Sequence, residues 1–174
     1  MRASLFLVLC VSFATPAASQ YSLPGKVRGD NNVTVVVFIA TDCPISQKYI
    51  PALNEIHKRY DGKMNFYSVI PGKVKIKSLK KFIQEYDITF TVTPDKKYDR
   101  VKALGASVTP QVFVFDRRDA LKYHGAIDNW FYELGGYRNK PTENYLIDAI
   151  ESVLAEKDPK TESTKALGCF IQIP

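Results

Sequence analysis

The chain has 174 residues, of which 45% are hydrophobic and 24% are charged, and it carries a net charge of +6 at pH 7. This length and apolar content suit one globular domain with a sizeable core, and three cysteines are too few for a disulfide-rich scaffold. The lysines are densest between residues 73 and 97. Such a cluster is typical of a solvated face, so no nucleic-acid partner is expected.

The N-terminus has the pattern of a secretory signal. A basic start, Met1-Arg2, precedes an apolar run at residues 3–14 and a stretch of small residues at 15–19. The apolar run is shorter than the roughly 20 residues that span a bilayer. We expect a signal peptide at residues 1–19, cleavage after Ser19, and export to the periplasm or the extracellular space without stable membrane insertion. An uncleaved anchor or a buried helix is the alternative.

Cleavage would remove Cys10 and leave Cys43 and Cys169 in the mature chain. Disulfides persist in exported proteins. The two cysteines can therefore form one structural bridge, act as a redox couple, or serve as two unrelated thiols. The cysteine count leaves all three readings open.

The first half of the expected domain alternates strands and helices. Residues 33–40 form a β-branched, apolar run that predicts a central strand buried on both faces. Apolar residues spaced by three and four predict an amphipathic helix at 44–60, with a proline in its first turn. A second strand at 64–70 and a second helix at 76–86 follow.

The second half ends in a predicted hairpin and a last helix. In chain order, we expect a short strand at 89–92, a helix from 94 to 104, a strand at 108–116, its hairpin partner at 120–124, an aromatic loop at 129–140 and a helix at 142–154. This order predicts an α/β fold, with a mixed central sheet and helices on both faces. We place the domain at residues 20–156. The polar composition that follows predicts a flexible tail at 157–174, which carries Cys169.

The order of these elements resembles the thioredoxin-like superfamily. Within it, the chain is most similar to the redoxin branch, which comprises the peroxiredoxins and thiol-disulfide oxidoreductases of bacterial envelopes. The resemblance covers residues 33–169 and implies a thioredoxin-like three-layer sandwich. It is carried by Cys43, Pro44, Tyr49, Pro51, Leu53, the Val-Thr-Pro sequence at 108–110, and the segments 123–128, 145–149 and 164–169.

Cys43 is the candidate nucleophile. A thiol reacts as its thiolate, and a free cysteine with a pKa of about 8.5 is mostly protonated at neutral pH. At the start of a helix, unpaired backbone N–H groups and the helix dipole lower this pKa, whereas the neighbouring carboxylate of Asp42 raises it. We expect a modest net depression. A buried, inert cysteine is the alternative.

The resemblance also implies a substrate-binding surface beside Cys43. It implies a cis bond between Thr109 and Pro110, with the backbone of Thr109 pairing with an incoming substrate strand. Thr41, Pro44 and Ser46 complete the candidate substrate-binding residues. Thr41 lies close to the position of a family hydroxyl, and Ser46 can donate a hydrogen bond to a thiolate.

Two departures from the family patterns affect the function. Thioredoxins carry Trp-Cys-x-x-Cys, where this chain has Asp42 and Ser46 in place of the tryptophan and the second cysteine. A mixed disulfide at Cys43 therefore needs another thiol for its release. Peroxiredoxins carry Pro-x-x-x-Thr-x-x-Cys, where this chain has Val36 and Ala40. The hydroxyl that helps to orient a peroxide is missing from its usual place.

Cys169 can supply the missing thiol, because a flexible tail would let it reach Cys43. A pairing with an outside partner, or no role, is the alternative. We predict thiol-disulfide exchange in the cell envelope, on protein or small-molecule disulfides, with a reducing partner that the sequence does not identify. A peroxiredoxin-type thiol peroxidase and a non-catalytic module that traps partner proteins are the two rival functions.

No cofactor and no metal site is expected. Copper-carrying relatives of this fold use two cysteines four residues apart and a distant histidine. Here Ile39 stands where the first of these cysteines would be. Cys43 with His57 or His124 makes a poor site for a metal ion.

Overall fold

The computed structural model describes residues 32–174 of the chain. The expected signal peptide at residues 1–19, with Cys10, lies outside the described residues. Within residues 32–174, no helix combines the length and the apolar character that crossing a membrane requires.

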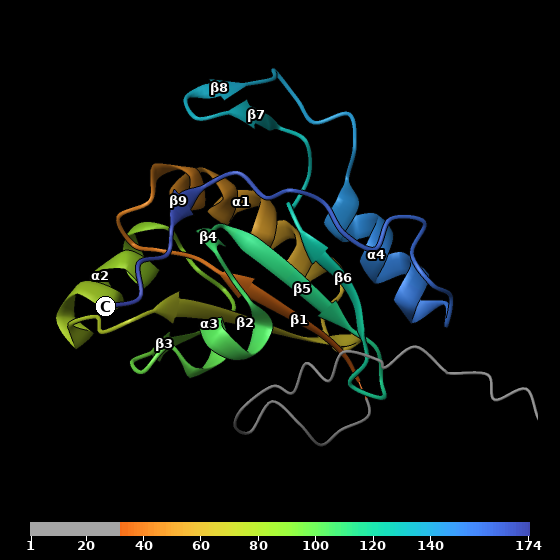
Figure 1. Cartoon of the computed structure of the whole chain (residues 1–174), viewed down its shortest axis with the longest axis horizontal. Coiled ribbons are helices and arrows are strands. Elements are labelled where there is room, and N and C mark those ends of the chain that lie inside the picture. The colour runs from red at the N-terminus through yellow and green to blue at the C-terminus, as the bar shows by residue number, and fades with distance from the viewer. Residues whose placement is uncertain (1–31) are drawn as a thin grey trace, which may run out of the picture.

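A mixed sheet forms the centre of the described chain. Its five strands are β1 (Val33–Phe38), β2 (Met64–Pro71), β3 (Thr91–Asp95), β5 (Gln111–Phe115) and β6 (Leu121–Gly125). They lie in the order β3-β2-β1-β5-β6 (Figure 1). β1 pairs parallel with β2, and β2 pairs parallel with β3. β5 runs antiparallel to both of its neighbours.

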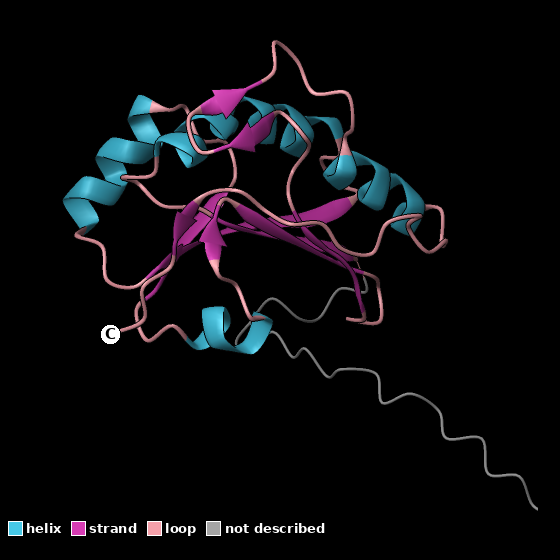
Figure 2. Cartoon of the chain, turned by 45° about the horizontal axis from the view of Figure 1, so that its top comes forward, coloured by secondary structure: helices cyan, strands magenta, loops and turns pink. Residues whose placement is uncertain are grey.

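Helices cover both faces of this sheet. Between residues 32 and 174 they are α1 (Pro44–Arg59), α2 (Ile76–Glu85), α3 (Asp99–Leu104) and α4 (Tyr145–Leu154). Figure 2 shows α3 on one side of the sheet and the other helices on the opposite side. The arrangement is a three-layer sandwich.

Alternate residues of β1 build the two halves of the core. Val35 belongs to the buried cluster that contains Leu53 of α1 and Ile150 of α4. Val36, the next residue, belongs to the cluster that contains Val101 of α3. Because successive side chains of a strand point to opposite faces, a strand that is buried at every position packs against a helix layer on each side. The predicted α/β class, with a mixed sheet covered on both faces, is confirmed.

The helix expected between residues 94 and 104 starts later, at Asp99, and Asp95 is the last residue of β3. The buried Asp95 carboxylate accepts hydrogen bonds from the backbone N–H groups of three successive residues, 99 to 101, at 2.9–3.0 Å. These are donors that the first turn of a helix leaves unpaired. The carboxylate therefore determines where α3 begins.

Three further boundaries differ from expectation. The strand predicted at 108–116 is divided at Pro110 into β4 (Val108–Thr109) and β5, because proline has no N–H for the ladder. The aromatic loop contains a short hairpin, β7 (Phe131–Glu133) and β8 (Gly136–Tyr137). The last helix begins at Tyr145, since the Asn129 side chain binds the backbone N–H groups of residues 142 and 143.

Composition predicts a flexible tail at residues 157–174, yet this segment packs along the domain (Figure 1). It first follows β6, where the backbone of His124 exchanges 3.1 Å hydrogen bonds with Glu162 and Thr164. It then crosses to β4, which pairs antiparallel with β9 (Cys169–Phe170). Both contacts use the edge of a strand, where unpaired N–H and C=O groups can bind an added strand.

Candidate functional site

Cys43 lies at the N-terminus of α1, after the turn that follows β1. It is the N-cap residue, with an extended backbone at φ −90° and ψ 111°, and Pro44 follows in the first turn of the helix. The Cys43 sulfur accepts a hydrogen bond from the backbone N–H of Ser46 at 3.5 Å. The thiol therefore faces the unpaired N–H groups and the positive end of the helix.

Ser46 and Thr41 hold the turn around Cys43. Ser46 is buried, and its hydroxyl accepts a hydrogen bond from the backbone N–H of Ala40 at 3.3 Å. The backbone carbonyl of Thr41 accepts a hydrogen bond from the Gln47 side chain at 2.8 Å. Together these bonds connect the end of β1 to the first turn of α1, and the connection positions the thiol.

Thr109, which precedes Pro110, lies directly against the thiol. The bond between Thr109 and Pro110 is cis. The Cys43 thiol donates a hydrogen bond to the Thr109 carbonyl oxygen at 3.1 Å, across 66 positions of sequence. The antiparallel register of β1 and β5, which pairs Phe38 with Gln111, brings these two segments together.

Strand β9 brings Cys169 to the same place. The Cys169 thiol donates a hydrogen bond to the Cys43 sulfur, with 2.6 Å between the sulfurs and 126 positions between the residues. Both cysteines are free thiols. The structure therefore joins the two cysteines of its described residues in one reduced pair, although they lie near opposite ends of the described chain.

The two thiols of this pair have opposite pKa shifts. For Cys43, burial is the largest influence and raises the pKa, but the hydrogen bonds from Cys169 and Ser46 together outweigh it, so the pKa lies below the usual value. Burial, the hydrogen bond to Cys43 and the charges of Cys43 and Asp42 raise the pKa of Cys169 to about 12. Of the two thiols, Cys43 is therefore the one that ionises first as pH rises.

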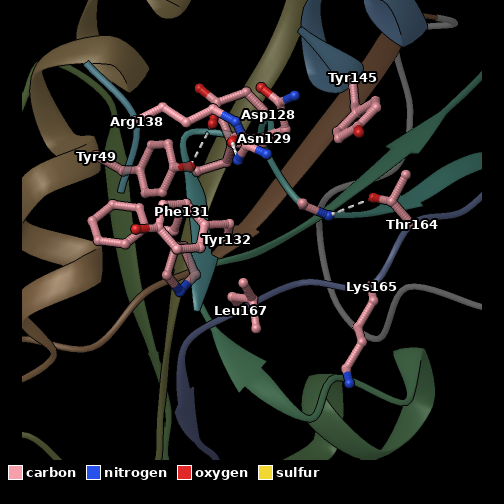
Figure 3. A pocket seen from close by; sticks show the side chains of 13 residues that line it. Tyr49, Asp128, Asn129, Phe131, Tyr132, Arg138, Tyr145, Thr164, Lys165 and Leu167 are labelled. Carbon is pink, nitrogen blue, oxygen red and sulfur yellow. Dashed lines mark hydrogen bonds between the residues drawn. The ribbon is translucent and has the colours of Figure 1, made fainter. Parts of the chain in front are cut away.

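A cavity of about 380 Å³ adjoins Pro110, the residue after Thr109, and Figure 3 shows its lining. Its walls include Pro110, at the entrance to β5, and Leu167 from the tail. Within it, the Tyr49 hydroxyl donates a hydrogen bond to the Asp128 carboxylate, and burial raises the pKa of Asp128. Sequence reasoning assigned no role to Asp128. Its only signal was a position inside the segment 123–128 that resembles the redoxin branch.

The two histidines considered as metal ligands make other contacts. The Nδ1 atom of His57 lies 3.1 Å from the Thr89 hydroxyl, and the ring of His124 stacks on Phe113. Among residues 32–174, no three His, Cys, Asp or Glu side chains come together in a group that could hold a metal ion.

Comparison with known proteins places this site in a family context. The sequence model described as the AhpC/TSA family matches residues 11–124. A hypothetical protein from Sinorhizobium meliloti has a similar structure, with a TM-score of 0.74, 26% identity, and coverage of 83% of this chain and 81% of that chain. An uncharacterized conserved protein from Geobacillus kaustophilus has a TM-score of 0.71, 20% identity, and coverage of 83% and 78%.

A putative thioredoxin from Neisseria meningitidis shares the fold more distantly. Its TM-score is 0.58 at 18% identity, with 74% of this chain and 79% of that chain covered. No curated protein matches the sequence. The family match includes Cys43, Thr109 and Pro110, whereas Cys169 lies C-terminal to it. The chain belongs to the AhpC/TSA family, within the redoxin branch of the thioredoxin-like superfamily.

Proposed function

We propose that this chain is a thiol-disulfide oxidoreductase of the cell envelope, with Cys43 as the nucleophile and Cys169 as the resolving thiol. The observation that carries the proposal is the 2.6 Å contact between the two sulfurs. The opposite pKa shifts of the two thiols support the assignment of roles. Cys169 takes the place of the second cysteine that Ser46 replaces in the helix turn.

In the reducing direction, the Cys43 thiolate attacks one sulfur of a substrate disulfide. The other substrate sulfur leaves as a thiolate and takes up a proton. Cys169 then loses its proton and attacks the Cys43 sulfur, and the bond between Cys43 and the substrate breaks. The substrate gains two electrons and two protons, and the chain retains a Cys43–Cys169 disulfide. A thiol reductant restores the dithiol, and the reverse steps would oxidise a substrate dithiol.

The first step also prepares the second. The negative charge of Cys43 contributes to the high pKa of Cys169. Once the Cys43 sulfur is bonded to substrate, it no longer carries that charge, so the pKa of Cys169 falls. The resolving thiol therefore becomes more nucleophilic only after Cys43 has reacted.

The remaining candidate residues serve this chemistry. Thr109 and Pro110 form the substrate edge, while Pro44, Ser46 and Thr41 shape the turn that presents the thiolate. The substrates are protein or small-molecule disulfides, and the reductant is a thiol partner. The secretory pattern at residues 1–19 supports export to the envelope, and the domain at 20–156 carries a C-terminal segment that delivers Cys169.

The test is the fate of the two thiols. Oxidised protein should show a Cys43–Cys169 cross-linked peptide by mass mapping and a faster band on a non-reducing gel. Reduction of an insulin-like disulfide should be lost in Cys43→Ser, and Cys169→Ser should accumulate a mixed disulfide at Cys43. The proposal fails if oxidation yields no bond between Cys43 and Cys169.

A thiol peroxidase is the second candidate, and membership of the AhpC/TSA family favours it. The Cys43 thiolate would attack the peroxide, release water or an alcohol, and become a sulfenic acid. Cys169 would then displace water and form the same disulfide. Ala40, in place of the peroxide-orienting threonine, disfavours this reaction. Consumption of hydrogen peroxide that is lost in Cys43→Ser would establish it.

The trapping role predicts a different outcome. A non-catalytic module would hold one partner in a stable mixed disulfide at Cys43, without multiple turnover. The contact of Cys169 with the Cys43 sulfur works against such stability, because Cys169 is placed to break the mixed disulfide. Persistence of a mixed disulfide in the wild-type chain would favour trapping.

A further inference from the structure

The C-terminal strand occupies the backbone edge beside the nucleophile. In the antiparallel register of β4 and β9, Thr109 faces Cys169 and Val108 faces Phe170. The backbone N–H of Ile171 donates a hydrogen bond to the Ser107 carbonyl at 2.9 Å. An edge has one set of N–H and C=O groups to offer. A second extended polypeptide therefore cannot pair with this edge of β4 while β9 is in place.

Gly168 lets this strand lie directly on the Thr109–Pro110 bond. A Cβ atom at position 168 would lie 2.1 Å from the Thr109 carbonyl oxygen and 2.5 Å from its carbonyl carbon. Backbone atoms of the domain cannot yield as the end of a flexible side chain can. Gly168 is not among the glycines with positive φ, so the close approach, and not the backbone conformation, requires glycine here.

Thr164 anchors the same segment on the far side of the cavity. Its hydroxyl lies 2.6 Å from the Tyr123 hydroxyl, and it accepts a hydrogen bond from the backbone N–H of Ala126 at 2.9 Å. Figure 3 shows Thr164 and Leu167 on the cavity wall, with the bond from Thr164 to the backbone drawn as a dashed line. The tail is thus attached at two places, on β6 and on β4.

The attached tail covers the Cys43 side chain. Cys43 has only 1% of its surface exposed, and Leu167 and Cys169 pack against the cluster that contains it. Phe170, the residue after Cys169, is 79% exposed. The strand is therefore held by its backbone, by Cys169 and by Ile171, which packs against the core cluster that contains Val101. The Phe170 side chain adds little burial.

We propose that residues 168–171 occupy the edge of β4 on which a partner strand would otherwise dock. A polypeptide partner then reaches Cys43 only by displacing these residues. The inference rests on the proposed function in one respect, because it takes Cys43 as the group that a partner must reach. The partner that fits best is an extended segment with glycine immediately before its cysteine. A cysteine opposite Thr109 places the preceding residue against the Thr109 carbonyl, where a side chain has no room.

The test measures how fast iodoacetamide alkylates Cys43, by mass spectrometry of the Cys43 peptide, in full-length protein with Cys169→Ser. Adding Gly168→Ala should speed this alkylation about tenfold, because the added methyl group overpacks only the closed form. Ile171→Pro, which removes the backbone bond to Ser107 and the packing of the Ile171 side chain, should speed it as well. Gln172→Ala, an exposed change in the same tail, is the matched control and should leave the rate unchanged.

Acceleration by both Gly168→Ala and Ile171→Pro supports the proposal. Rates within about twofold of the control for either variant overturn it, provided that thermal unfolding shows a folded domain. This measurement involves no turnover. Failure of disulfide exchange would therefore refute the proposed function alone, whereas unchanged alkylation would refute the occupation of the β4 edge alone.

A second arm tests whether the opened edge accepts a polypeptide. A synthetic peptide of residues 165–172, with serine for cysteine, is added at millimolar concentration to the protein that carries Gly168→Ala and Cys169→Ser. It should slow alkylation of Cys43, and the same peptide with alanine for its glycine should not. Equal protection by both peptides, or protection by neither, contradicts a glycine-dependent docking edge.

Discussion

Thr164→Val tests whether the C-terminal segment is held as a separable unit. Valine has the shape of threonine without the hydroxyl, so it removes the contacts with the Tyr123 hydroxyl at 2.6 Å and with the Ala126 N–H at 2.9 Å. One such bond contributes about 1 kcal/mol, and a buried N–H left without an acceptor costs about 1–3 kcal/mol. The site is only partly buried, so water replaces part of this loss. We expect the docking of the segment to weaken by about 2 kcal/mol.

Native-state hydrogen exchange measures this loss where it occurs. A weakening of about 2 kcal/mol raises the population of the open segment about thirtyfold. The Ile171 amide, which donates to Ser107, should therefore exchange about thirtyfold faster. The amides of β1 report on unfolding of the whole domain and should keep their wild-type rates.

Thr164→Ser is the matched control, because it keeps the hydroxyl and loses only a methyl group. Its Ile171 amide should exchange close to the wild-type rate. The reasoning is refuted if exchange in the valine variant stays within about threefold of wild type. It is also refuted if serine and valine act alike, or if the amides of β1 accelerate to the same extent.

Three other changes test the electrostatics and the helix start. Cys169→Ala removes the hydrogen bond to Cys43 and should raise the pKa of Cys43, which is measured by titrating the thiolate absorbance. Cys169→Ser keeps a hydrogen-bond donor and should raise this pKa less. Asp95→Ala should lower the free energy of unfolding in urea by about 2 kcal/mol, because three N–H groups at the start of α3 lose their acceptor; Asp95→Asn should cost less. Because burial raises the pKa of Asp128 in the folded protein, protonated Asp128 stabilises the fold at pH values below its pKa in the unfolded chain. This stabilisation is lost as pH rises through its pKa in the folded protein. Unfolding free energies of wild type relative to Asp128→Asn should therefore be larger at acidic than at neutral pH, and the opposite trend would contradict the assignment.

Local sequence patterns were sufficient to predict most of the helices and strands, because the spacing of apolar residues reports local structure. The run at residues 33–40 predicted a strand buried on both faces, and the spacing at 44–60 predicted α1. At two helix starts that were predicted too early, a single side chain outside the helix decided the boundary. Asp95 delays the start of α3, and Asn129 delays the start of α4. Neither contact has a periodic signal.

The sequence by itself determined the α/β class and the position of Cys43 between a buried strand and an amphipathic helix, since both follow from local patterns. Its composition also predicted a flexible tail, and only the tertiary structure decided that this segment docks and brings Cys169 to the Cys43 sulfur. That contact depends on the unpaired edge of β4 and on the fit of Gly168 against the Thr109 carbonyl. Thr109 and Cys169 lie 60 residues apart. The fit between two backbone segments so far apart in the sequence cannot be predicted from the local composition of either segment.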